Sequence, residues 1–134
     1  MRNYGPFRIV AGVLFAAAAL VGITRAADAD AQARSRLTGV VWMRTTPAEP
    51  AGTFRIFLAG GTVMTGSCTE TYRIDRWRSN SASRVTITED GIAIPADLSF
   101  NGAELRMRLR LRDGVREERF RPARVPYLCP STRR

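Results

Sequence analysis

The segment Leu105-Arg-Met-Arg-Leu-Arg-Leu-Arg112 alternates apolar and basic residues over its whole length. Successive side chains of a β-strand point to opposite faces, so this alternation predicts one strand with an aliphatic face and an arginine face. Such a strand contacts a hydrophobic core on one side only. The segment therefore favours an all-β fold with a concentrated cationic surface.

Short apolar or alternating runs recur along the rest of the chain, with turn signals between them. The expected strands lie at 37–42, 53–58, 62–68, 69–78, 84–88, 92–100, 105–112 and 115–121. Glycine-containing dipeptides typical of hairpins separate several of them: Gly60-Gly61, Asp90-Gly91, Asn101-Gly102 and Asp113-Gly114. Pro95 indicates an edge or a bulge in the sixth strand. The spacing predicts a small antiparallel up-and-down barrel or sandwich of about eight strands.

The N-terminus has the pattern of a secretory signal peptide. Arg2 and Arg8 precede the apolar run Ile9–Ile23, and small residues follow. This order predicts a signal peptide helix at 1–26, with cleavage no later than residue 33. The apolar run is shorter than the about 20 residues of a membrane span. An uncleaved membrane anchor is the alternative. Only in that case do we expect the chain to enter a membrane, through residues 1–26.

After cleavage we expect a flexible leader at 27–36 and a single β domain at 37–134, located in the periplasm or secreted. The two cysteines, Cys68 and Cys129, predict a disulfide in such a compartment. Two free buried thiols are the alternative. The chain has no histidine and no third cysteine, so neither a zinc site nor another cofactor is predicted.

All 21 basic residues are arginine, a bias that codon usage alone could produce. Their distribution is uneven: Leu105–Arg134 holds 10 arginines and 3 acids, whereas 27–104 holds 8 arginines and 9 acids. Such asymmetry predicts an anionic partner. Outside the cytoplasm the partner would be an anionic envelope component or an acidic protein, and nucleic acid is not expected.

A turn at Asp113-Gly114 would pair the arginine strand with Val115–Arg121 and place Arg108 opposite Arg119. The outer face would then hold six arginines and a single acid, Glu117. Guanidinium groups bind phosphate and carboxylate through paired hydrogen bonds, so this face is a candidate anion-binding site. A solvated face that discourages aggregation is the alternative. The six residues are Arg106, Arg108, Arg110, Arg112, Arg119 and Arg121.

Four other residues form a candidate pocket or rim: Glu70, Tyr72, Arg116 and Glu118. Alternation places each of them on an inner face near the end of a strand. A buried glutamate needs a partner, and Arg116 is a candidate partner for Glu70. A frayed hairpin tip, with Glu70 at the rim, is the alternative.

Catalytic signals are few. The absence of histidine excludes Ser-His and Cys-His nucleophile arrangements. Glu70 and Glu118 are a weak carboxylate pair for glycoside hydrolysis. We therefore expect no enzymatic activity and predict a binding or interaction module of the cell envelope. A small enzyme that uses Glu70 is a further hypothesis.

Several short motifs resemble a known family. Leu37-Thr-Gly39-Val-Val-Trp42, Gly60-Gly-Thr62 and Gly66-Ser-Cys68 are similar to motifs of the META/HslJ-like small exported bacterial β domains. This resemblance implies an envelope protein and no catalytic residues. Thr69 departs from the family pattern, in which asparagine follows the cysteine.

The outline is also similar to that of lipocalin-like barrels, although those open with Gly-x-Trp and this chain has Gly-x-x-Trp. The alternative function is a calycin-like carrier that holds a small apolar ligand inside the barrel.

Overall fold

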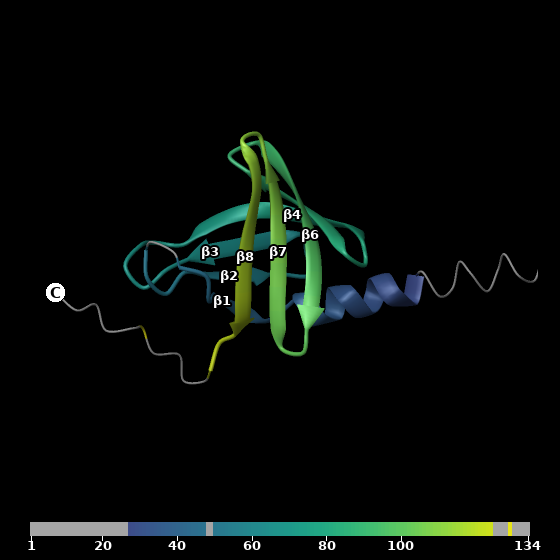
Figure 1. The fold of residues 1–134 in the computed structure, drawn as a ribbon, viewed down its shortest axis with the longest axis horizontal. Coiled ribbons are helices and arrows are strands. Elements are labelled where there is room, and N and C mark those ends of the chain that lie inside the picture. The colour runs from purple at the N-terminus through teal and green to yellow at the C-terminus, as the bar shows by residue number, and fades with distance from the viewer. Residues whose placement is uncertain (1–26, 48–49, 125–128, 130–134) are drawn as a thin grey trace, which may run out of the picture.

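The structure, a computed structural model, describes residues 27–47, 50–124 and 129. The signal peptide expected at 1–26 lies outside the described residues. Eight antiparallel strands follow one another around a closed barrel, so the predicted all-β fold is confirmed (Figure 1). The strands are β1 (Val41–Arg44), β2 (Phe54–Phe57), β3 (Thr62–Gly66), β4 (Arg73–Ser81), β5 (Arg84–Glu89), β6 (Ile92–Asn101), β7 (Glu104–Leu111) and β8 (Gly114–Pro122).

The barrel closes where the first strand meets the last. β1 pairs with β8, with Met43 opposite Arg121, and it pairs with β2 on its other side. Every strand therefore has a neighbour on each side, which removes the free edges that would otherwise invite pairing with another chain.

Alternate residues of the strands fill the interior, as the aliphatic face of the arginine strand predicted. Phe57 and Phe120 are fully buried, and Phe57 meets Trp77 edge to face with ring centroids 5.4 Å apart. The remaining buried apolar side chains are Leu37, Trp42, Val63, Val85, Ile87, Ala96, Leu98, Leu105, Met107 and Leu109. The centre of the barrel is thus a packed apolar core.

The inner face of strand β4 is the opposite of the predicted one. Alternation placed Tyr72, and with it Ile74, on the inner face. Trp77 is buried, whereas Ile74 is 65% exposed. The larger apolar surface of the indole decides the orientation, because facing it outward would leave more apolar area in water. The Trp77 Nε1–H also donates to the carbonyl oxygen of Leu58 at 2.9 Å. Because β4 begins at Arg73, Tyr72 belongs to the preceding loop and is 63% exposed.

Residues 27–37 form a helix where the sequence predicted a flexible leader and the start of a strand. Its alanine-rich composition suits a helix, but it lacks an apolar stripe along its length, which is why periodicity did not reveal it. Only Leu37, its last residue, is buried, and the carbonyl oxygen of Leu37 accepts a hydrogen bond from Trp42 Nε1 at 2.9 Å.

The end of this helix covers one end of the barrel (Figure 1). The Arg36 guanidinium lies 4.3 Å from the centre of the Phe100 ring and donates to the carbonyl oxygen of Gly102 at 3.0 Å. Gly102 lies in the turn between β6 and β7, so the helix is attached to that turn. The loops at the other end of the barrel carry no such cover among the described residues.

A disulfide joins Cys68, in the loop after β3, to Cys129 in the C-terminal tail. The two Cα atoms are 5.7 Å apart and 61 residues separate the cysteines in sequence. The predicted disulfide is therefore confirmed.

We expect a Cys68→Ala/Cys129→Ala variant to have a free energy of unfolding about 4 kcal/mol lower than the oxidised protein, because the cross-link restricts a long loop in the unfolded chain. Urea denaturation followed by tryptophan fluorescence measures this difference. Reduction of the wild-type protein should give the same loss. A change below about 1 kcal/mol would show that the link contributes little to stability.

Candidate functional site

The uncovered end of the barrel contains a polar pocket of about 330 Å³, which we call the mouth pocket. It lies among the β1–β2 and β3–β4 loops and the inward side chains at the ends of β2 and β8. Its lining residues are Arg44, Pro50, Thr53, Arg55, Thr65, Gly66, Ser67, Glu70, Thr71, Arg73, Arg116 and Glu118.

A layer of ion pairs forms the floor of the mouth pocket. Glu118, 2% exposed, contacts Arg44 through a 3.3 Å Nη1–Oε1 distance and Arg55 through a 3.7 Å Nη2–Oε2 distance. Arg55 also bonds to Glu89 at 3.3 Å, and its Nη1 lies 3.5 Å from the sulfur of Met107. The charged layer therefore lies directly on the apolar core.

Strand alternation explains why these charges are buried. Arg55 precedes the buried Phe57 by two residues, and Glu118 precedes the buried Phe120 by two. Both charged side chains thus point inward, at the level where the barrel begins to open. Burying either charge alone would cost several kcal/mol, so each needs partners of opposite charge: Arg44 and Arg55 for Glu118, and Glu89 and Glu118 for Arg55.

Three of the four predicted pocket residues line the mouth pocket: Glu70, Arg116 and Glu118. Glu118 is the buried glutamate, and it pairs with Arg44 and Arg55 rather than with Arg116. Glu70 and Arg116 are exposed and form no ion pair with each other. Tyr72 is not among the lining residues. The sequence prediction missed Arg44 and Arg55. Arg44 follows the inward Trp42 by two residues, which could have revealed it, whereas the apolar run of Phe54, Ile56 and Leu58 has the opposite parity to Arg55 and conceals it.

The β7–β8 hairpin has a different register from the expected one. Its turn is Arg112-Asp113, with Leu111 opposite Gly114, so Arg108 faces Glu117 instead of Arg119. Gly114 has a φ of +139°, a conformation that favours glycine at this position. The two-residue shift keeps every side chain on its predicted face. The opposed arginines are now Arg106 and Arg119, and Glu117 forms ion pairs with both of them.

The outer face of β7 and β8, the arginine face, is partly neutralised. Glu117 pairs with Arg106 at 3.5 Å and with Arg119 at 3.0 Å. The other acids that pair with this face come from outside the predicted set: Asp97 contacts Arg110 at 2.6 Å, and Glu104 contacts Arg121 at 3.6 Å.

Two of the six predicted arginines, Arg108 and Arg112, are exposed and form no ion pair with any described residue. The arginine face therefore keeps an excess of positive charge after its internal pairs are counted.

Asp97 of β6 lies between two guanidinium groups. It accepts hydrogen bonds from Arg110, at 3.0 and 2.6 Å, and from Arg84 at 2.9 Å. The hydrogen bonds from Arg110, followed by the one from Arg84, hold the pKa of Asp97 below its ordinary value. Its carboxylate therefore stays ionised to a lower pH than that of an unpaired aspartate.

A cleft opens in the barrel wall between β6 and β7. The last β6–β7 pair toward the uncovered end is Ala96 with Leu109, whereas β6 continues to pair with β5 as far as Ile92. The Leu98 N–H donates to the carbonyl oxygen of Ser83, on the β5 side of β6. Backbone nitrogens along a strand point alternately to its two neighbours. The nitrogen of Ala96 therefore also points toward β5, and that of Pro95 points toward β7. Because it has no hydrogen to donate, the ladder ends there.

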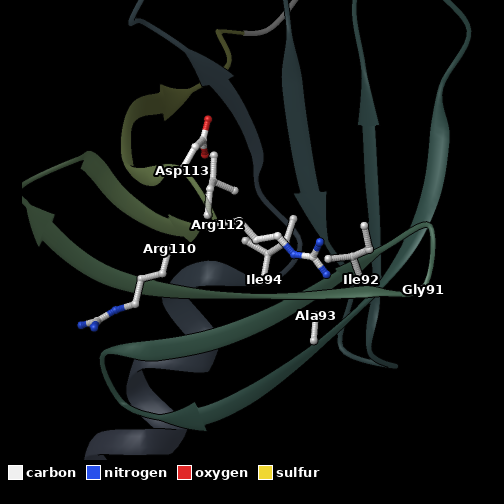
Figure 2. A pocket seen from close by; sticks show the side chains of 8 residues that line it. Gly91, Ile92, Ala93, Ile94, Arg110, Arg112 and Asp113 are labelled. Atoms are coloured by element: carbon white, nitrogen blue, oxygen red, sulfur yellow. The ribbon is translucent and has the colours of Figure 1, made fainter.

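The resulting wall cleft has a volume of about 620 Å³. Its apolar lining comes from Ile92, Ile94 and Leu111, and Arg112 lies at its rim. Figure 2 shows the Arg112 side chain extending toward Ile94 and Ile92, whereas Arg110 points away from them. The prediction that Pro95 marks a strand edge is thus met locally, inside a barrel that is otherwise closed.

No protein-family model, curated protein or solved structure matches this chain. The eight-stranded antiparallel barrel is compatible with the predicted lipocalin-like outline. In the described part of the chain, no helix is long and apolar enough to cross a membrane. The same residues contain no group of three or more histidine, cysteine, aspartate or glutamate side chains that could hold a metal ion.

We expect a Glu118→Ala variant to lose about 3 kcal/mol of unfolding free energy, because the buried Arg55 would keep only Glu89 as a partner and the half-buried Arg44 would lose its carboxylate. The matched control is Glu117→Ala, which removes the neighbouring, exposed carboxylate and should change stability by less than about 1 kcal/mol. Chemical denaturation measures both. Equal losses in the two variants would contradict a special role for the charged layer.

We also expect the pKa of Asp97 to rise toward its ordinary value in an Arg110→Ser variant, because the largest cause of its lowering is removed. Since the folded-state pKa is the lower one, the ion pair is present above the ordinary pKa and is lost as pH falls through the folded value. NMR titration of the carboxyl carbon measures this pKa. Arg112→Ser, which removes an arginine without this contact, should leave it unchanged.

Proposed function

We propose that this protein is a non-enzymatic binding module of the cell envelope, periplasmic or secreted, that attaches to anionic envelope surfaces through its arginine face. The observation that carries the proposal is the excess charge on the outer surface of β7 and β8. Arg108 and Arg112 are exposed there without ion-pair partners among the described residues. Exposed guanidinium groups on one face can bind phosphate groups of an anionic surface.

Location in the envelope is supported by three features. The signal peptide pattern at 1–26 is typical of exported chains. The Cys68–Cys129 disulfide is compatible with an oxidising compartment. The resemblance of the Gly39, Gly60 and Gly66 motifs to those of META/HslJ-like domains implies the same location.

A carrier of an apolar ligand in the barrel interior has less support. Phe57, Met107 and Phe120 occupy the centre of the barrel and are fully buried. The ion pairs of Arg55 and Glu118 lie across the mouth above them. An apolar ligand entering through the mouth pocket would have to disrupt a buried charged layer, which costs several kcal/mol.

Attraction between the arginine face and an anionic surface should decrease with ionic strength. The Debye length is about 8 Å at physiological salt and shortens to about 3 Å at 1 M. A basic residue near an anionic lipid surface contributes about 1 kcal/mol. Removing two such residues should therefore weaken binding by about tenfold or more.

The proposal predicts that the mature protein cosediments with phosphatidylglycerol-containing vesicles at low salt and is released at high salt. An Arg106→Ser/Arg108→Ser variant should bind at least about tenfold more weakly, since both residues lie on the arginine face. The matched control is Arg76→Ser/Arg78→Ser, which removes the same charge from exposed positions on β4, across the barrel. This control should keep most of the binding.

Equal weakening by both double variants would mean that net charge, and not this face, governs attachment, which would overturn the proposal. Binding to poly-glutamate without binding to vesicles would also overturn it and would point to an acidic protein as the partner.

A further inference from the structure

We propose that the wall cleft between β6 and β7 binds one acyl chain of an anionic phospholipid, with the lipid phosphate at Arg112. This inference rests on the proposed function and deepens it, because it assigns the cleft a lipid chain and the neighbouring arginine a headgroup. Attachment would then combine charge attraction over the arginine face with insertion of a chain at one defined place.

The floor of the cleft is an extension of the barrel core. Ile92 and Ile94 share the inward side of β6 with the buried Ala96, and Leu111 shares that of β7 with the buried Leu109. Because the strands separate beyond Pro95, this apolar surface continues to the outside, and Ile92 is 57% exposed. Exposed apolar surface that lines a groove gains free energy when an apolar group covers it.

Arg112, beside the cleft, is a cation without an ion-pair partner among the described residues. Arg110 is held by Asp97, whereas Arg112 forms no ion pair with any described residue. Figure 2 shows Arg112 extending over the apolar lining and the Asp113 carboxylate pointing away from it. A guanidinium group beside a groove can bind a phosphate at the end of a chain that lies in the groove.

The combination favours an amphiphile over simpler ligands. A volume of about 620 Å³ lies within the range of small-molecule sites, about 300–1,000 Å³. An anion without an acyl chain would leave Ile92, Ile94 and Leu111 exposed to water. A neutral hydrocarbon would leave Arg112 without a counter-ion. An anionic phospholipid satisfies both, and the proposed attachment to an anionic surface brings it to the cleft.

The test uses soluble lipids so that cleft binding is separated from surface attachment. Lysophosphatidylglycerol below its critical micelle concentration should bind the mature protein in isothermal titration calorimetry. Glycerophosphoglycerol, which has the same headgroup without a chain, should bind far more weakly, because each buried methylene contributes about fourfold in affinity. Lysophosphatidylcholine, with its zwitterionic headgroup, should bind more weakly than the anionic lipid.

Two pairs of variants locate the site. Ile92→Ser should weaken lysophosphatidylglycerol binding by about tenfold, whereas Ile74→Ser, which changes another exposed isoleucine away from the cleft, should not. Arg112→Ser should also weaken it, whereas Arg108→Ser, at an equally unpaired arginine outside the cleft, should not. Circular dichroism checks that each variant is folded.

The outcomes separate this inference from the proposed function. Vesicle binding that depends on Arg106 and Arg108, together with no binding of lysophosphatidylglycerol or no effect of Ile92→Ser, would overturn the cleft inference alone. Absence of salt-sensitive vesicle binding would overturn the proposed function. Chain-dependent binding that Ile74→Ser and Ile92→Ser reduce equally would also overturn the assignment to the cleft.

Discussion

Closure of the sheet between β1 and β8 is the constraint on which the rest of the structure depends. Once each strand has two neighbours, one face of the sheet is enclosed and the other faces outward, so alternation along the strands sorts most side chains. The leucines of β7 then join the core and its arginines form an outer surface. Closure also creates two ends, one covered by the helix that finishes at Leu37 and one lined by charged residues.

The inward side chains change character along the barrel axis. Phe57 and Phe120 are apolar at mid-height, and two residues nearer the uncovered end the same strands place Arg55 and Glu118 inside. The interior can accept these charges because they neutralise one another at the level where water becomes accessible. The packed core thus leaves no room for a ligand at the centre, and the mouth pocket, the wall cleft and the arginine face all lie outside it.

Local patterns predicted the eight antiparallel strands well because an up-and-down sheet needs only alternation and tight turns, whereas the choice between a closed barrel and a sandwich was beyond them. Those patterns predicted β5, β6 and β7 and the inward aliphatic face of the arginine strand. They failed for β4, because Ile74 and Trp77 have opposite parity and only packing in three dimensions decides between them. Local patterns also could not predict which residues pair across β7 and β8, because a register shift of two residues leaves every side chain on the same face. For this reason the partners of Glu118, and the acids that pair with the arginine face, could not be identified.

Pro95 has a consequence for the behaviour of the protein in a crowded compartment. Where β6 and β7 separate, the pairing between them ends and a short stretch of each strand has an open backbone edge of the kind that pairs with strands of other molecules. The proline presents no donor on that side, so it makes the free edge of β6 a poorer template for an incoming strand. The residue that opens the wall therefore also weakens pairing with a second copy at that opening.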